Sequence, residues 1–231
     1  MKTKNRSTTD GKALIVRARD CYKLMTNPRS KEDELSETTK SWLKEMAVEE
    51  VLGLRKVVDT KPMMKGALCM HESIDLYNKV MTTGYKKNSV TKVKDGFSGT
   101  PNLLGNDCAI KIITSWDATT FPFFQDEANK LFKKSGHDWQ CRVYMMLFGK
   151  NRAAVSYCLV DTPSETPQGD VLLNKWDDCS LHRFDGIVDA QKRVSTSEVI
   201  ERDRSIEQKM LERYVVANRY YQHYLEELIN K

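Results

Sequence analysis

The chain has 231 residues, a length that suits one decorated domain better than two full domains. Hydrophobic residues make up 40% and charged residues 30%, which allows a real core under a water-compatible surface, and no apolar run approaches the roughly 18 residues of a membrane span. The net charge of +5 permits a polyanionic partner without requiring one. The first ten residues lack the apolar stretch of a signal peptide. With no long apolar run in the sequence, we expect no membrane partner.

Cysteine and histidine spacing gives no sign of a metal or disulfide site. Six cysteines stand at positions 21, 69, 108, 141, 158 and 179, and no two have the Cys-x-x-Cys spacing of zinc ribbons. Several lie in apolar stretches, as Cys158 does, and neither His71 nor His137 has a second histidine at ligand spacing. We therefore expect buried, reduced thiols and no metal site.

The first third of the chain predicts a tail, a loop and two helices. Residues 1–12 are basic and polar, and residues 27–38 are rich in residues that break regular structure. One helix is expected through Leu43, Met46, Val51 and Leu54. A second helix is expected from one apolar stripe with spacings of four and three, at Met63, Ala67, Met70, Ile74, Tyr77 and Met81.

The remainder alternates strands with helices. Residues 97–104 predict a short strand, residues 107–115 an alternating strand, and residues 153–160 a buried strand. Residues 137–148 between them predict a helix, and residues 164–181 are rich in turn residues. The last segment predicts a long amphipathic helix, with apolar positions at Ile206, Met210, Tyr214, Ala217, Tyr221, Tyr224 and Leu228. This order indicates layered α/β architecture with a mixed sheet.

Several short segments within this frame have an informative order. Gly99-Thr-Pro-Asn102 is followed nine residues later by Lys111-Ile-Ile113-Thr-Ser-Trp-Asp117. Trp139-Gln140-Cys-Arg-Val-Tyr144 comes next, and the strand Val155-Ser-Tyr-Cys-Leu-Val-Asp-Thr-Pro163 follows it. Upstream of all three, Lys65-Gly66 opens a helix that bears Glu72.

Together these segments resemble the PD-(D/E)XK nuclease superfamily, in its RecB-like and YqaJ-like phage exonuclease branch. Members of this group carry Gly-x-Pro-Asp, then Asp-Ile-Lys-Thr-Ser-Trp, then Gln-x-x-x-Tyr. The resemblance runs from about residue 62 to residue 163 and into the last helix. It implies a restriction-endonuclease-like α/β core, in which helices flank a mixed central sheet and a long C-terminal helix follows.

The resemblance also suggests a division of the chain and a source. We expect a basic N-terminal tail and polar loop over residues 1–37, a nuclease-like domain over residues 38–195, and a C-terminal helix over residues 196–231 that packs on the domain or extends it. A phage or prophage source would place the protein in the cytoplasm of a bacterial host, or in a virion.

The chemistry of the family explains which residues it needs. Carboxylates hold Mg²⁺, which neutralises the phosphate and activates a water molecule. An acid and a lysine two residues apart on a strand share one face, so both meet the substrate. At the matching positions this chain has Asn102, Lys111 and Ile113, and the expected helix acid falls near Met70, with Glu72 two residues further on.

The resemblance therefore predicts a nuclease fold without a working metal site or another cofactor. The first hypothesis is a pseudonuclease that binds DNA or a protein partner through the old cleft, with contacts from Lys65, Lys111, Gln140, Arg142 and Tyr144.

Other interpretations of the same residues remain open. Gln140 and Tyr144 could merely anchor the sheet, and the basic residues could lie on a solvated face. The chain could be an active Mg²⁺-dependent nuclease with displaced acids such as Glu72 or Asp117. It could also be a virion component or a host-defence antagonist that uses the fold as a scaffold. The choice between DNA and protein, and the oligomeric state, stay open.

Overall fold

The computed structural model describes residues 12–54 and 59–231, so all but the last residue of the expected tail over residues 1–12 lies outside the described residues. The α-helices are α1 (Cys21–Leu24), α2 (Glu37–Leu52), α3 (Lys61–Leu68), α4 (Met70–Met81), α5 (Gln125–Lys134), α6 (His137–Phe148) and α7 (Arg204–Ile229). The strands are β1 (Val16–Arg17), β2 (Lys92–Lys94), β3 (Phe97–Gly99), β4 (Leu103–Leu104), β5 (Cys108–Thr114), β6 (Arg152–Cys158), β7 (Val194–Thr196) and β8 (Ile200–Glu201). Short 3-10 turns are η1 (Ala18–Asp20), η2 (Cys179–Leu181) and η3 (Ala190–Arg193).

The larger sheet is mixed, as the sequence predicts. Its strand order is β4-β5-β6-β7, and β8 also pairs with β6. β5 and β6 run parallel over their full lengths, from Cys108 opposite Arg152 to Thr114 opposite Cys158. Parallel neighbours need a crossover connection, and α5 and α6 supply it. β4 and β7 pair antiparallel on the two sides of this central pair.

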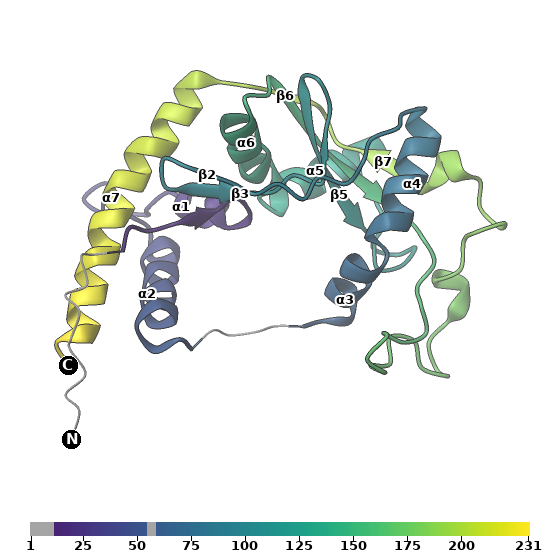
Figure 1. Ribbon diagram of the computed structural model, residues 1–231, viewed down its shortest axis with the longest axis horizontal. Coiled ribbons are helices and arrows are strands. Elements are labelled where there is room, and N and C mark those ends of the chain that lie inside the picture. Colours follow the sequence, from purple (N-terminus) through teal and green to yellow (C-terminus); the bar gives the residue numbers. More distant parts are fainter. Residues whose placement is uncertain (1–11, 55–58) are drawn as a thin grey trace.

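The central pair is covered on both faces (Figure 1). Ile110 and Ile112 point into a cluster with α4, whereas Ala109 and Ile113 belong to the larger cluster with α6. This split confirms the alternation predicted for residues 107–115. The predicted helix over residues 137–148 and the buried strand near residues 153–160 are also confirmed, as α6 and β6.

A smaller sheet with the order β1-β3-β2 lies beside the larger one. β2 and β3 form a two-residue hairpin at Asp95 and Gly96, and both residues have positive φ. Asp-Gly is a strong sequence signal for such a turn, although only β3 was expected here. A larger residue would also not fit at position 96, because a Cβ there would lie 2.1 Å from a ring atom of Tyr214 in α7.

The N-terminal segment departs from the expected division at residue 37. Leu14, Val16 and Leu24 are fully buried, and β1 pairs with β3. The Leu14 amide donates to the Asn218 side chain of α7, and the Tyr214 hydroxyl donates to the Leu14 carbonyl. Residues 14–24 are therefore part of the core, and their assignment to a tail and loop is wrong because alternating apolar residues complete the small sheet.

One helix prediction needs correction, and one helix was not predicted. The single helix expected from Met63 to Met81 is two helices, α3 and α4, which are separated at Cys69, and both of those methionines are exposed. α5 was not expected, because few of its positions are apolar. Its acids Asp126 and Glu127 in the first turn and its lysines in the last turn are a recognisable helix pattern.

The prediction of buried thiols holds for four of the six cysteines. All six cysteines are free, four of them are buried and one is exposed. Among the helices of the described residues, none has both the length and the apolar character needed to cross a bilayer.

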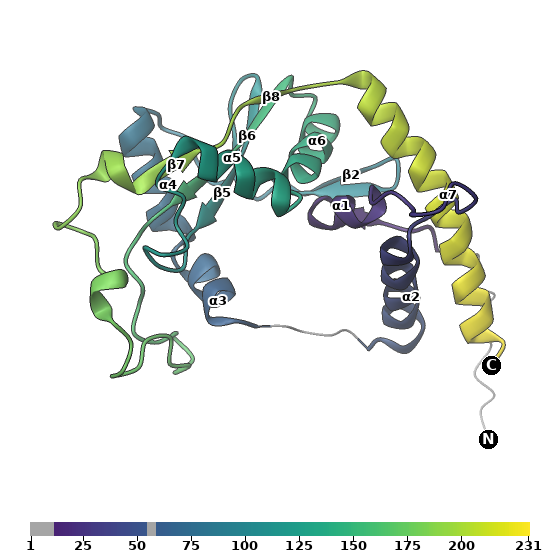
Figure 2. The same ribbon diagram turned by 180° about the vertical axis from the view of Figure 1, so that it is seen from behind.

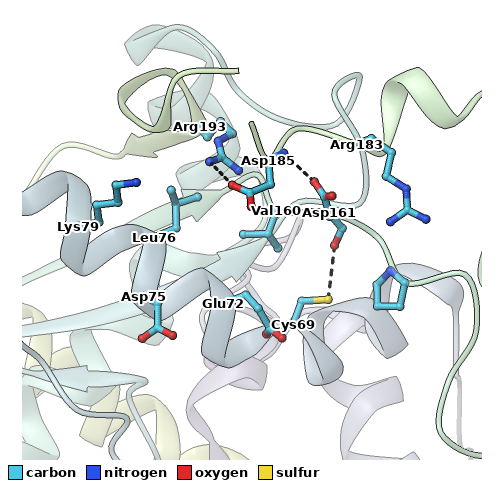
Figure 3. A pocket seen from close by; sticks show the side chains of 11 residues that line it. Cys69, Glu72, Asp75, Leu76, Lys79, Val160, Asp161, Arg183, Asp185 and Arg193 are labelled. Carbon is cyan, nitrogen blue, oxygen red and sulfur yellow. Dashed lines mark hydrogen bonds and ion pairs between the residues drawn. The ribbon is translucent and has the colours of Figure 1, made fainter. Parts of the chain in front are cut away.

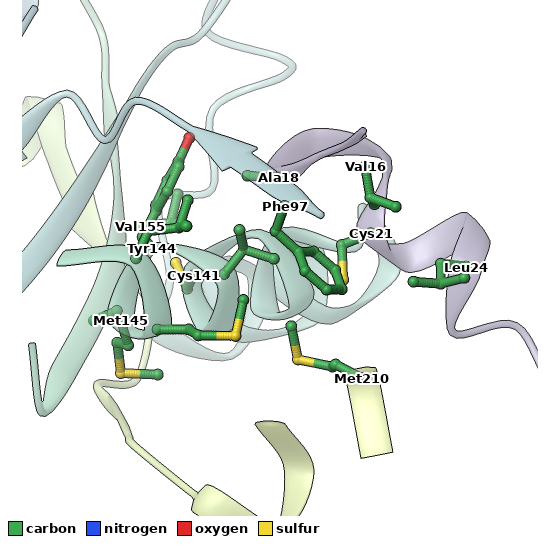
Figure 4. Packing of buried hydrophobic residues seen from close by; sticks show 14 of the residues in the cluster. Val16, Ala18, Cys21, Leu24, Phe97, Cys141, Tyr144, Met145, Val155 and Met210 are labelled. Atoms are coloured by element: carbon green, nitrogen blue, oxygen red, sulfur yellow. The ribbon is translucent and has the colours of Figure 1, made fainter. Parts of the chain in front are cut away.

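α7 closes one end of the molecule, where it lies along α2 (Figures 1 and 2). Its buried side chains are Met210, Ala217, Tyr221 and Leu225. Met210 reaches the cluster that contains Phe97, Cys141 and Tyr144 (Figure 4). The predicted C-terminal amphipathic helix is thus present, and its apolar stripe joins the main core.

Met210→Ala should lower the free energy of unfolding by about 2–5 kcal/mol, because it leaves a cavity under α7. Val215→Ala on the same helix should change it by less than about 0.5 kcal/mol, since Val215 is 68% exposed. Urea unfolding of the two variants and the wild type checks this. Equal losses would contradict the packing of α7 described above.

Candidate functional site

Asn102 lies between the two sheets, one residue before β4. Its Oδ1 accepts a hydrogen bond of 3.0 Å from the Ile112 amide of β5, and its Nδ2 donates to Met70 Sδ at 3.4 Å. The side chain therefore ties β5 to the first turn of α4. Asn102 and Met70, which are expected to match one strand position and the helix position of the family, are therefore in contact, whereas Lys111 and Ile113 point to the other face of β5.

Lys111 and Ile113 share the face of β5 that looks toward α6. Lys111 is partly buried, and burial lowers the pKa of its ammonium group, with the charge of Arg19 acting in the same direction. Within residues 12–54 and 59–231, no carboxylate forms an ion pair with Lys111. Burial and the Lys111 charge together lower the pKa of His137 to about 4, so this imidazole is neutral at pH 7.

These side chains do not fit a divalent cation such as Mg²⁺. The Asn102 amide is neutral and its oxygen already accepts the Ile112 amide. Lys111 brings a positive charge, and Ile113 and Met70 bring no oxygen at all, whereas Mg²⁺ requires oxygen ligands and usually carboxylates. In the described part of the chain, no group of three His, Cys, Asp or Glu residues is arranged to hold a metal ion.

The Gln140–Tyr144 pair lies inside the protein. The Gln140 Nε2 donates to the Tyr144 hydroxyl at 2.6 Å, and both side chains are buried. The Tyr144 ring also lies against Gly99, where a Cβ would be 3.0 Å from a ring carbon. Burial favours the interpretation in which this pair anchors α6 to the sheets over direct contact with DNA.

Lys65 is not available to a ligand, so its predicted contact with DNA is wrong in this structure. Its side chain is fully buried, and its Nζ donates to the Trp116 carbonyl at 2.7 Å. Burial lowers its pKa to about 8, although Cys69, Asp117 and Asp161 act in the opposite direction. Helical periodicity did not reveal this position, because lysine is almost never fully buried.

The other predicted residues make local contacts of their own. Arg142 stacks on Trp139 with 5.8 Å between its guanidinium carbon and the ring centre. Glu72 is exposed on α4, which covers the opposite face of the sheet. The Asp117 carboxylate accepts from the Thr119 hydroxyl and the Thr120 amide, so it shapes a turn. In the described part of the chain, neither acid belongs to a group that could hold a metal ion.

Sequence reasoning missed Arg19, whose charge acts on Lys111 and which itself lines an open hollow. η1 carries Arg19 into a hollow of about 900 Å³ that lies among η1, α1 and α2, with Met63 of α3 at its edge. The basic residues that line it are Arg17, Arg19, Lys23 and Lys44, and the acidic ones are Asp20, Glu45, Glu49 and Asp59.

The buried Lys65 should make stability depend on pH in a definite direction. The pKa of Lys65 falls from 10.5 in the unfolded chain to about 8 in the folded protein. Between pH 8 and 10.5 the unfolded state therefore binds more protons than the folded state, so the contribution of Lys65 to the free energy of unfolding rises with pH. The difference in unfolding free energy between wild type and Lys65→Met should therefore shift in favour of wild type over this range. Urea titrations at several pH values check this, and exposed Lys87→Met is the control that should show no such trend.

Comparisons with known proteins identify solved structures with a similar fold. No protein-family profile and no curated protein sequence matches the chain. A phage-related exonuclease from Haemophilus somnus 129PT has a similar structure, with a TM-score of 0.84 and 28% sequence identity over 94% of this chain and 97% of that one.

A more distant likeness is limited to the fold. The alkaline exonuclease LHK-Exo from Laribacter hongkongensis has a TM-score of 0.60 at 13% identity, over 94% of this chain and 92% of that one. Its complex with dAMP has a TM-score of 0.59 at the same identity, over 93% and 91% of the two chains. The chain therefore has the nuclease-like fold of the YqaJ-like phage exonucleases in the PD-(D/E)XK superfamily, as its motif order predicts.

Proposed function

We propose that this protein binds DNA in the cleft beside Lys111 and Arg19 and does not cut it. The observation that carries the proposal is the partly buried Lys111, which lies without a counterion among the described residues. Withdrawing a charge from water costs free energy unless another group compensates for it. A phosphate oxygen would provide the missing negative partner, and the neighbouring Arg19 could add a second, forked contact.

The proposed role of Lys111 is that of a fixed positive charge. It would hold a phosphate where a metal ion would otherwise lie, but an ammonium group cannot lower the pKa of a bound water as a metal can. The neutral His137 beside it adds no further charge to the contact. The exonuclease structures similar to this chain support a nucleic-acid ligand over other polyanions.

Binding of duplex DNA should fall steeply with salt, because each neutralised phosphate releases counterions. Lys111→Ala should weaken binding by about threefold to tenfold at low salt and reduce the slope of log affinity against log salt by about one unit. Fluorescence anisotropy with a labelled duplex at several salt concentrations, with and without Mg²⁺, measures both. Sequence preference should stay unchanged, since phosphate contacts carry no sequence information.

Lys209→Ala is a matched control, because Lys209 is an exposed lysine on α7 and carries the same charge. It should leave the affinity and the salt slope close to those of the wild type. Binding that is insensitive to salt and to Lys111→Ala would count against DNA as the ligand.

Restoring the missing groups should restore metal binding. The combination Asn102→Asp, Lys111→Asp, Ile113→Lys and Met70→Glu would supply three carboxylates and a lysine at the sequence positions where the family is expected to carry them. We expect Mg²⁺ binding by calorimetry and slow nucleotide release from linear duplex DNA. Each single reversion should do little, because residues that act as a unit are strongly non-additive.

The same assay tests the proposal on the unmodified protein. If the wild type releases nucleotides in a Mg²⁺-dependent manner, and Asn102→Ala or Lys111→Ala abolishes the release, the chain is an active nuclease and the proposal is wrong.

A further inference from the structure

The connection between β6 and β7 differs in charge from the rest of the chain. Residues 161–189 contain seven acidic and two basic residues, although the whole chain has a net charge of +5. The segment contains only the short η2 turn and an isolated bridge between Glu165 and Val171. Connections longer than about 15 residues without regular structure usually have a functional role in compact domains.

This acidic connection also exposes large apolar side chains. Trp176 is 84% exposed, Ile187 is 74% exposed, and Val171 is exposed as well. Exposed apolar groups set among charged residues often mark a surface that contacts another protein. DNA is a poor partner for this surface, because the acidic side chains would repel its phosphates.

Two hollows with shared lining residues lie between this connection and α4, and Figure 3 shows the first of them. The first has a volume of about 500 Å³ and is lined by Glu72, Asp75, Asp161 and the apolar Leu76 and Val160, among others. The second has a volume of about 640 Å³ and includes Ile187. Lys79, Asp185 and Arg193 line both, so the two hollows form one groove, here called the α4 groove.

Arg193 lies at the junction of the two hollows with an unused donor. The residue is only 6% exposed, and one terminal nitrogen pairs with Asp185 at 3.2 Å. Its Nε has no hydrogen-bond partner within the described part of the chain. A buried donor without an acceptor is rare and costs free energy, so a ligand that supplies an acceptor here would gain from it.

Unpaired acids stand on the wall opposite Arg193. Glu72 and Asp75 are separated by three residues and Lys79 follows after four, so all three share one face of α4. Both carboxylates are exposed, and neither has an ion pair among the described residues. The groove thus has a buried donor without a partner, Arg193 Nε, on one side, and the exposed carboxylates of Glu72 and Asp75 with Lys79 on the other.

We propose that the α4 groove docks a basic peptide segment of a partner protein. A backbone carbonyl of the segment would accept from Arg193 Nε, and its lysine or arginine side chains would pair with Glu72 and Asp75. Ile187 would contact an apolar side chain. α4 covers the face of β5 opposite to Lys111, so this docking does not depend on DNA binding in the cleft.

Fluorescence anisotropy of the full chain with a labelled peptide of alternating lysine and leucine tests the proposal. We expect saturable binding that weakens about tenfold in Glu72→Gln/Asp75→Asn and in Arg193→Lys. A peptide of alternating glutamate and leucine should not bind. Glu226→Gln/Glu227→Gln on α7 makes the same charge change at the other end of the molecule and should leave the affinity unchanged.

The substituted acids are exposed, so the double variant should keep the melting temperature of the wild type, which circular dichroism confirms before titration. Equal weakening in both double variants would show attraction by overall charge and would overturn the proposal. Binding of the glutamate peptide would do the same. It would also be overturned if the lysine peptide fails to bind while Glu72→Gln/Asp75→Asn abolishes self-association in sedimentation experiments, since the occupant would then be a second copy.

Discussion

The parallel pairing of β5 with β6 is the constraint on which the rest of the structure depends. Parallel strands cannot be joined by a tight turn, so the chain must cross over through α5 and α6 and bury one face of the pair. α4 buries the other face. Because side chains alternate, this register sends Ile110 and Ile112 toward α4 and Lys111 and Ile113 toward α6. A slip of one residue would bury a different set on each face.

The same constraint explains how the fold persists without the expected acids. Asn102 bonds the Ile112 amide through an oxygen that a carboxylate would also provide, so the scaffold does not distinguish the amide from the acid. Ile113 packs into the α6 cluster, where a lysine would have to extend its amine outward. Lys111 is different, because its burial is unfavourable in the free protein. Residues that lower stability locally without visible compensation are often retained for a function.

The sequence predicts best those elements that are buried along most of their length, because burial gives them a regular pattern of apolar residues. β5, α6 and β6 bury most of their length, so periodicity locates each to within one or two residues. β1 and β2 are too short for a period to emerge, and the Asp95-Gly96 turn is the clearest local signal for β2. The break between α3 and α4 falls inside an unbroken apolar stripe, so only tertiary packing reveals it.

Site residues were harder to place, because their surroundings come from distant segments. The motif order suggests that Asn102 lies next to β5, and the structure has it there. The motif order gave no sign that the Lys65 amine donates to the carbonyl of Trp116, which is 51 positions away. Arg19 sits in a segment expected to be loop, and only the pairing of β1 with β3 carries it toward Lys111. Local sequence patterns do not encode contacts of this kind.

The two faces of the larger sheet carry different charged residues. Arg19 and Lys111 lie on the α6 side, whereas Glu72, Asp75 and the acidic connection lie on the α4 side. At physiological salt, exposed charges are screened beyond about 8 Å, and the sheet with its covering helices is thicker than that. An anionic ligand on one face would therefore feel little repulsion from the acids on the other. The central strands and the helices that cover them thus keep Lys111 apart from the acidic connection.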